Sequence, residues 1–392
     1  MSLIGDSSEK SGAKSGPPFR ADHIGSLLRP PALKEAREKF LGPQTPDQNL
    51  GPHGNPGLTA VEDDAIRSVV AMQERVGLRG ITDGEFRRRS WWLEMIMSWE
   101  GFAADRTGSA EFAWRRPDGT RANSSRLSIV GPIERRRSAM VPAFKFLAAA
   151  TTRTPKITIP APIWLHLLAG GDRLIRTGYY KDIDAFWADL ITAYKAELTD
   201  LAAAGAKYIQ FDDVGLAFLC DAEHRATIES WGEKPAELIA TYARHVNDIL
   251  SAVPADVTVT MHQCRGNREG GWAAEGGYDP VADALFNRFD FDGYFLEWDT
   301  PRAGGFEPLR LLPKGKTVVL GVMSSKSGEL ESADFLKRRV DEAARFAPLD
   351  QLAISPQCGF ASSIGGNPLT ESQQEAKLAR IVEVATAIWG TV

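Results

Sequence analysis

The sequence predicts an α/β fold, and more specifically a (β/α)8 TIM barrel with an insertion after its second strand. Short apolar runs that end in polar residues alternate with amphipathic helical stretches, which is the pattern of parallel α/β architecture. Eight such runs can be counted along the 392-residue chain, and eight is the strand number of this barrel. Hydrophobic residues make up 43% of the chain and charged residues 25%, so a folded globular body is expected.

The strand candidates are short apolar runs, most of which end in polar residues. They lie at residues 21–27, 78–86, 156–162, 207–213, 257–264, 292–299, 317–324 and 351–358. Apolar residues at helical spacing predict helices between several of these runs. These helices are expected at residues 183–204, 234–252, 333–346 and 370–388.

The remaining segments are less regular. Residues 1–18 are rich in Ser, Gly, Lys and Pro without periodicity, which predicts a flexible tail. The stretch from about 99 to 150 contains a Pro-Asp-Gly turn signal and is interpreted as an insertion after the second strand. No linker divides the chain beyond the tail, so residues 19–392 are predicted to form one catalytic barrel domain.

The charge balance and the length of the apolar runs indicate which kinds of partner the protein does not bind. The chain has 46 Lys and Arg against 51 Asp and Glu, a net charge of -5, which lacks the basic excess that a phosphate backbone selects. No apolar run approaches the roughly 18 residues that span a bilayer, and the first residues lack the apolar core of a signal peptide. We therefore expect a cytoplasmic protein that binds neither nucleic acid nor a membrane.

Chemically active residues gather where the predicted strands end, which is where a barrel carries its active site. Three cysteines do not describe a disulfide framework. His262 and Cys264 are two residues apart on one strand and therefore face the same way. With Glu297 and Cys358, they provide the nitrogen, sulfur and oxygen donors of a catalytic zinc site. Ordinary buried thiols beside a capping histidine, or a purely structural metal site, are the alternatives.

Several motifs resemble those of one family. They are HIGSLLRP at 23–30, TDGEFRR at 82–88, YIQFDD at 208–213, MHQC at 261–264, FLEWD at 295–299 and SPQCGF at 355–360. In these motifs the chain resembles the catalytic C-terminal barrel of cobalamin-independent methionine synthase, and more closely the short single-barrel members of that superfamily. The resemblance covers nearly everything after the tail.

The resemblance implies a zinc-dependent S-methyltransferase in which a zinc-bound thiolate, that of homocysteine, takes a methyl group to form methionine. It implies that His262, Cys264, Glu297 and Cys358 bind Zn2+. It also implies that the homocysteine amino acid is held by Ile24, Gly25, Ser26, Glu85 and Asp212. No cobalamin is expected, and methyltetrahydrofolate is a candidate methyl donor. A small-molecule thiol and a methyl donor are therefore the expected partners, and the oligomeric state is left open.

The chain departs from the family at three places. It has no room for the second barrel of full-length methionine synthase. Lys326 lies at or near the position of the family's general-acid histidine and is a candidate proton donor, or else an anion-binding lysine. Near the family's pterin-stacking position the chain has His166 and, two residues earlier, Trp164. His23 and Arg29 flank the IGS turn and are candidates for binding an anionic group, although Arg29 is equally plausible as a loop anchor.

Two other functions stay open. On the same scaffold, epoxyalkane coenzyme M transferase uses a zinc thiolate to open an epoxide, and the arginines 87–89 after the GE motif could serve such a sulfonate thiol. The other function is a binding protein that keeps the zinc and thiol site but transfers no methyl group. Porphyrinogen decarboxylase barrels need no zinc cysteines and are disfavoured by the metal set.

Overall fold

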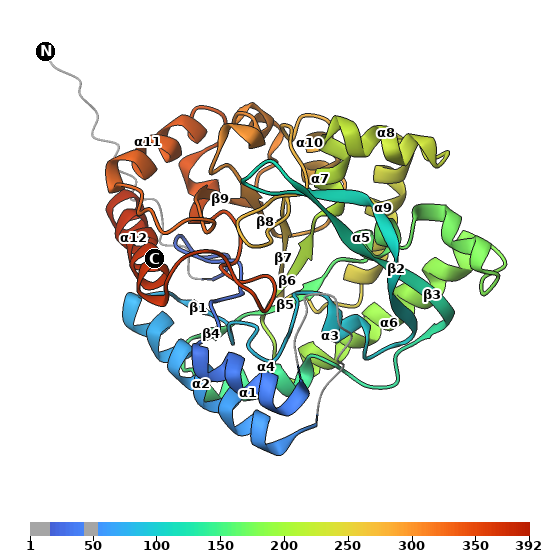
Figure 1. The fold of residues 1–392 in the computed structure, drawn as a ribbon. Coiled ribbons are helices and arrows are strands. Elements are labelled where there is room, and N and C mark those ends of the chain that lie inside the picture. The colour runs from blue at the N-terminus through green and yellow to red at the C-terminus, as the bar shows by residue number, and fades with distance from the viewer. Residues whose placement is uncertain (1–15, 43–53) are drawn as a thin grey trace, which may run out of the picture.

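The computed structural model describes residues 16–42 and 54–392, and its centre is a parallel sheet (Figure 1). Six strands pair in the order β10-β9-β8-β7-β6-β5, all parallel. Their bounds are β5 Ile157–Pro160, β6 Tyr208–Asp213, β7 Thr258–Gln263, β8 Gly293–Glu297, β9 Thr317–Met323 and β10 Leu352–Pro356. Predicted strands three to eight are thus confirmed as neighbours in one sheet.

The first two predicted strands are much shorter than expected. β1 (Gly80–Ile81) pairs in parallel with β4 (Thr154–Pro155), which directly precedes β5. The first predicted strand, 21–27, is reduced to a parallel bridge between Ala21 and Ile354 of β10. Among the described residues, the ladders therefore do not form a closed ring. The α/β class is confirmed, and most of the predicted tail lies outside the described residues.

Helices surround the sheet (Figure 1). They are α1 Pro31–Leu41, α2 Pro56–Val76, α3 Leu93–Ile96, α4 Val141–Ala150, α5 Pro162–Leu168, α6 Ile183–Ala203, α7 Gly215–Cys220, α8 Ala222–Ser230, α9 Pro235–Leu250, α10 Ala282–Asn287, α11 Ala333–Ala343 and α12 Glu371–Trp389. The four predicted helices correspond to α6, α9, α11 and α12. Local caps explain their starts: Asp182 accepts the N–H of Ala185 at α6, and Thr370 forms a capping box with Gln373 at α12. No helix among the described residues is both long and apolar enough to cross a membrane.

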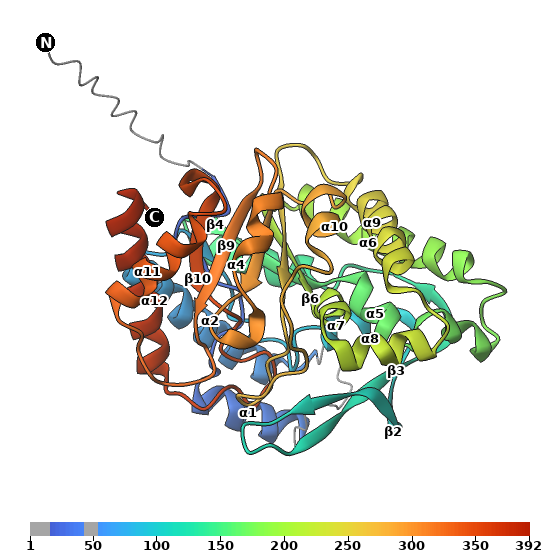
Figure 2. The same cartoon turned by 90° about the horizontal axis from the view of Figure 1, so that it is seen from above.

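Most of the predicted insertion, from about 99 to 150, is a β-hairpin formed by β2 (Glu100–Arg115) and β3 (Arg121–Glu134), and its last part is α4. It extends along one side of the molecule, apart from the central sheet (Figure 2). Arg115, at the end of β2, forms an antiparallel bridge with Trp272. Its guanidinium also lies 2.9 Å from Asp221 and 3.0 Å from Glu223. The hairpin tip is therefore attached to the loop after β7 and to the start of α8.

Candidate metal and substrate site

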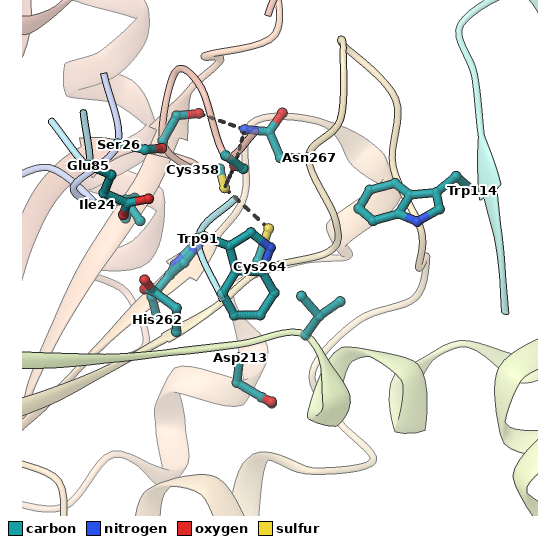
Figure 3. A pocket seen from close by; sticks show the side chains of 14 residues that line it. Ile24, Ser26, Glu85, Trp91, Trp114, Asp213, His262, Cys264, Asn267 and Cys358 are labelled. Carbon is teal, nitrogen blue, oxygen red and sulfur yellow. Dashed lines mark hydrogen bonds between the residues drawn. The ribbon is translucent and has the colours of Figure 1, made fainter. Parts of the chain in front are cut away.

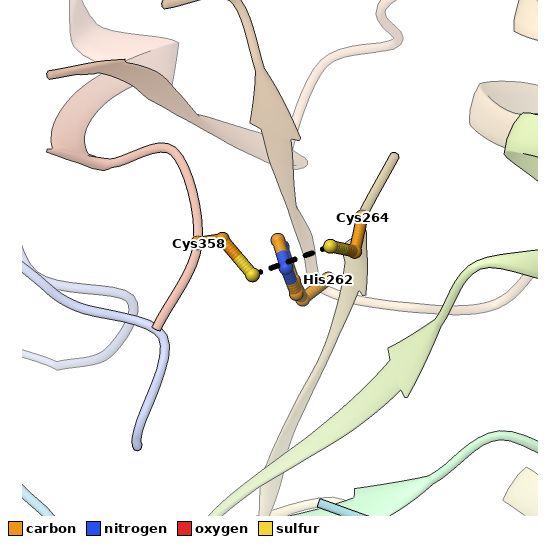
Figure 4. Close-up of side chains that lie close together, drawn as sticks. All are labelled: His262, Cys264 and Cys358. Atoms are coloured by element: carbon orange, nitrogen blue, oxygen red, sulfur yellow. Dashed lines mark hydrogen bonds between the residues drawn. The ribbon is translucent and has the colours of Figure 1, made fainter. Parts of the chain in front are cut away.

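Three of the four predicted metal ligands converge at the carboxyl ends of two strands (Figure 4). His262 lies near the end of β7, Cys264 follows that strand, and Cys358 follows β10. One ligand atom from each lies within 4.8 Å of the other two, and all three residues are buried. The two Sγ atoms are 3.2 Å apart. Strand alternation places His262 and Cys264 on one side, as the sequence predicts.

The hydrogen bonding of His262 fits a metal. Its Nδ1 lies 3.2 Å from the carbonyl oxygen of Phe295, which can only accept, so Nδ1 carries the proton. Nε2 then presents a lone pair, and this buried atom has no hydrogen-bond partner in the described part of the chain. A backbone carbonyl that fixes the tautomer is a usual outer partner of a metal-binding histidine. One imidazole and two thiolates are a zinc-type donor set, so the residues present fit zinc.

The two thiols differ in acidity. Burial disfavours the thiolate of Cys358, but the thiol of Cys264, 3.2 Å away, and the neighbouring His262 hold the pKa of Cys358 well below its usual value. The hydrogen bond to Cys358, together with burial, raises the pKa of Cys264. Without a metal, the pair therefore shares one proton. A cysteine binds a metal ion as its thiolate, and the contacts of Cys358 already stabilise a thiolate there.

Glu297, the fourth predicted ligand, is the last residue of β8 and is fully buried. Its Oε1 lies 3.3 Å from Arg302 and 3.6 Å from Lys326, and its Oε2 accepts the N–H of Arg265 at 3.2 Å. Burial opposes ionisation, but Lys326 and Arg302 hold the pKa of this carboxyl below its usual value. Its carboxylate therefore contacts cations and does not belong to the three-residue group. Its role as a ligand stays a prediction.

A pocket adjoins the three-residue group and contains most of the predicted site residues (Figure 3). It is lined by Ile24, Ser26, Glu85, Trp91, Trp114, Asp212, Asp213, Val214, His262, Cys264, Asn267, Cys358, Gly359 and Ser362. Ile24, Ser26 and Glu85 lie on one side and Trp114 on the other, with the cysteines between them. The cavity volume is about 30 Å³.

Two buried carboxylates face this pocket. Glu85 has a positive φ of 61°, an uncommon conformation for a residue other than glycine, and such strain is frequent at functional sites. Its Oε1 accepts a 3.0 Å hydrogen bond from Thr158, and its Oε2 has no partner in the described chain. Asp212 accepts from Gln210 at 2.7 Å. Burial, with a further contribution from Glu85, raises the pKa of Asp212 to about 7. Such a pair favours a cationic ligand.

The IGS turn presents backbone donors. The N–H groups of Ile24, Gly25 and Ser26 donate no hydrogen bond to any described residue. Gly25 has a φ of +147°, and a Cβ there would lie 2.7 Å from the side chain of Thr158, so glycine is needed for this close approach. Successive free N–H groups attract an anion such as a carboxylate. The turn therefore lies where the resemblance places the substrate carboxylate.

The predicted anion-binding residues beside the turn lie elsewhere. His23 does not line the pocket, and burial together with Lys156 lowers the pKa of His23 to about 4. The guanidinium of Arg29 donates to the carbonyls of Ala361, Ser363, Glu85 and Arg88. The structure thus favours the loop-anchor interpretation of Arg29, because this side chain connects the turn after β1 to the loop after β10.

The aromatic residues near the site are not those that the sequence singled out. Trp164 packs behind Trp91, with ring centroids 5.9 Å apart, and His166 contacts Tyr242 and Asp172 instead. Trp91 and Trp114 line the pocket. The sequence analysis singled out neither of them, because Trp91 lies after the GEF motif and Trp114 lies in the insertion.

Asn267 was also missed. Its side-chain amide donates to the carbonyl of Gly359 at 2.6 Å and to Ser362 at 3.2 Å, which connects the loop after β7 to the loop after β10. The signal that could have found it is its position three residues after Cys264, in the loop that carries a candidate ligand.

The chain thus has a parallel α/β fold with paired carboxylates and a His-Cys-Cys group that could hold a metal ion at its strand ends. Comparison with known proteins identifies the family. Residues 55–387 match the family model described as the catalytic domain of cobalamin-independent synthase, and the chain belongs to this family.

Individual relatives agree with this assignment. The chain is 40% identical over 388 residues to the uncharacterized Bacillus subtilis protein YxjG, with 97% of each chain covered. It is 27% identical over 344 residues to a protein named methionine synthase from Saccharolobus solfataricus, with 86% of each covered. Its fold matches the crystal structure of a Listeria monocytogenes protein provisionally named a vitamin-B12 independent methionine synthase, with a TM-score of 0.72, 34% identity, and coverage of 95% and 98%.

Proposed function

We propose that this protein is a zinc-dependent S-methyltransferase that methylates the thiol of homocysteine to form methionine without cobalamin. The observation that carries the proposal is one pocket in which His262, Cys264 and Cys358 adjoin the buried carboxylates of Glu85 and Asp212. The family and the methionine synthases among the relatives support the same activity.

The side chains suggest how the acceptor binds. The substrate ammonium group pairs with Glu85 and Asp212, and its carboxylate binds the N–H groups of Ile24, Gly25 and Ser26. This orientation directs the substrate sulfur toward His262, Cys264 and Cys358. These three residues, with Glu297 as a further candidate ligand, would hold zinc, which would supply the positive charge that keeps the acceptor thiol in its nucleophilic thiolate form at neutral pH.

The methyl transfer is a displacement at carbon. The acceptor sulfur forms a bond to the methyl carbon, the bond from that carbon to the donor breaks, and the leaving atom of the donor takes a proton. Methyltetrahydrofolate is the candidate donor, and Trp91 and Trp114 provide aromatic walls beside the sulfur position. Lys326 is the proposed proton donor. Its ammonium lies 3.6 Å from Glu297 and has no hydrogen-bond partner in the described chain.

We also propose that the central strands form a closed (β/α)8 barrel and that residues 19–392 form one domain. The bridge from Ala21 to Ile354 extends the sheet beyond β10, and β1 with β4 extends it beyond β5. A separate cluster of buried apolar residues supports closure, because its members come from the first segment and from four strands. They are Phe19, Ile24, Tyr208, Phe295, Val319 and Ala353.

A sulfonate thiol is a less suitable acceptor. Arg87 lies against Glu62 and Asp63, and Arg88 donates to Thr158. None of the three arginines that follow the GE motif is among the described residues that line the pocket. The carboxylates there would instead repel a sulfonate.

An assay of methionine formation tests the proposed function. Purified protein is incubated with homocysteine and methyltetrahydrofolate, and methionine is measured before and after chelation of the metal. We expect methionine formation that chelation abolishes and added zinc restores. In parallel, 2-mercaptoethanesulfonate replaces homocysteine, with the same donor and with an epoxide. Product from the sulfonate thiol alone would favour the epoxide-opening enzyme. Absence of turnover with a panel of methyl donors would favour a binding protein.

A further inference from the structure

A second cavity, with a volume of about 260 Å³, is lined by Asp83 of the Asp83-Gly84-Glu85 turn, whereas Glu85 of the same turn lines the candidate site. It is much larger than the cavity of the candidate site. Its walls come from α2, the turn after β1, α3 and the segment that leads into α4. They include three arginines and three carboxylates, Arg87, Arg88, Arg137, Glu62, Asp83 and Glu94.

Most of these charges already have partners. Both oxygens of Glu62 are bound, one by Arg37 and one by Arg87. Glu94 accepts the N–H groups of Arg89 and Ser90. Arg88 donates to Thr158. These groups therefore do not determine which ligand the cavity accepts.

Two charged groups of opposite sign, Asp83 and Arg137, can still form hydrogen bonds or ion pairs with a ligand. Asp83 is only 3% exposed, and its Oδ1 accepts the N–H of Glu85 at 2.8 Å, whereas Oδ2 has no partner in the described chain. A buried carboxylate oxygen without a partner is costly, so a donor is expected there. Arg137 is exposed and has no ion-pair or hydrogen-bond partner within residues 16–42 and 54–392, unlike Arg135 and Arg136.

The part of the cavity wall near the start of α4 is apolar and has a positive electrostatic potential. Arg137 precedes α4, whose N-terminal end carries partial positive charge, so an anionic group is favoured beside it. Ala139, Met140, Pro142 and Ala143 add apolar surface at the same end.

We propose that this cavity binds a free α-amino acid with an apolar side chain. Its ammonium group binds Asp83, its carboxylate binds Arg137 in the segment that leads into α4, and its side chain contacts the apolar wall. The Asp83 carboxylate also accepts the backbone N–H of Glu85, which lines the candidate site. A ligand that binds Asp83 therefore contacts the residue that positions Glu85. The inference stands independently of the proposed function, under which methionine would be both product and ligand.

The experiment uses the full-length E85Q variant, in which ligand binding at the candidate site is weakened. Arg137 lines the second cavity and not the candidate site, so its substitution reports on the second cavity even if the proposed function fails. Titration calorimetry with L-methionine is expected to show one bound ligand per chain. Introducing R137A or D83N into E85Q should weaken binding at least about tenfold, because each removes a charged partner. The D83N side chain retains the oxygen that accepts the N–H of residue 85, so the turn is expected to persist. R136A is the matched control and should bind as E85Q does.

Two analogues test the zwitterion requirement. 4-(Methylthio)butanoate lacks the ammonium group, and 3-(methylthio)propylamine lacks the carboxylate, so each should bind at least about tenfold more weakly than methionine. The proposal is overturned if E85Q binds no methionine, if R137A and D83N leave binding unchanged, or if either analogue binds as well as methionine.

Discussion

The ammonium of Lys156 lies 3.1 Å from the Oδ1 atom of Asp22, and both side chains are completely buried. Lys156 directly precedes β5, whereas Asp22 belongs to the first segment, which pairs with β10. The Oδ2 atom of Asp22 accepts a 2.8 Å hydrogen bond from Tyr208 of β6. This ion pair therefore connects the two ends of the parallel sheet where the backbone ladders leave a gap.

Replacing Lys156 with methionine should strongly destabilise the protein, because Asp22 would remain as a buried charge without its cation. Breaking a buried pair in this way costs about 3 to 5 kcal/mol. Urea unfolding followed by circular dichroism measures the change. Lys207→Met is the control, since Lys207 and Asp256 form an ion pair that is more than half exposed, and solvent screening leaves such a pair with little effect on stability. Equal losses in the two variants would mean that the buried pair does not hold the fold together.

His23 should make the fold sensitive to acid. Burial and the charge of Lys156 lower the pKa of His23 from 6.5 to about 4. Between these values the unfolded chain binds a proton that the folded chain does not, so stability falls as the pH falls from about 6.5 to about 4. The full effect is on the order of 3 kcal/mol. The free energy of unfolding, measured across this range, should depend less steeply on pH in His23→Gln. An unchanged slope would show that His23 does not titrate in this way.

The fold was predictable wherever an apolar run coincides with a strand. β6 and β7 fall within the predicted runs because YIQF and VTVTM are rich in β-branched and aromatic residues. The run at 21–27 forms only a parallel bridge at Ala21, because its backbone turns at Gly25 and leaves donors exposed to the pocket instead of in a ladder. The hairpin could not be placed, since its position depends on Arg115 reaching Asp221, a contact between residues far apart in the sequence.

The site was predictable where one strand carries several of its groups. Strand alternation is enough to place His262 and Cys264 together, and Cys358 follows from a neighbouring strand end. The direction of the Glu297 carboxylate was not predictable, because it depends on Arg302 and Lys326, which lie in loops. Trp114 was not predictable either, since it reaches the pocket only through the docked hairpin.

Cysteine substitutions should separate the metal ligands from an ordinary buried thiol. We expect about one zinc per chain in the purified protein and loss of zinc and activity in Cys358→Ser, with the fold retained. Cys220 is the matched control: its thiol is buried, contacts the carbonyl of Leu216 and lies outside the three-residue group, so Cys220→Ser should keep its zinc. Elemental analysis gives the zinc content and circular dichroism the fold. Full zinc occupancy in Cys358→Ser would refute the ligand assignment.

Glu85→Gln should weaken recognition of the acceptor's ammonium group. A hydrogen bond to a charged partner contributes about 1.5 to 3 kcal/mol, so the KM for homocysteine should rise about tenfold to a hundredfold, with a smaller change in kcat. The acceptor 4-mercaptobutanoate lacks the ammonium group, and its kcat/KM should be similar in wild type and Glu85→Gln. Glu329→Gln is an exposed control and should match wild type with both acceptors. If Glu85→Gln impaired both acceptors equally, Glu85 would not be the ammonium partner, and its strained backbone would instead serve to shape the pocket.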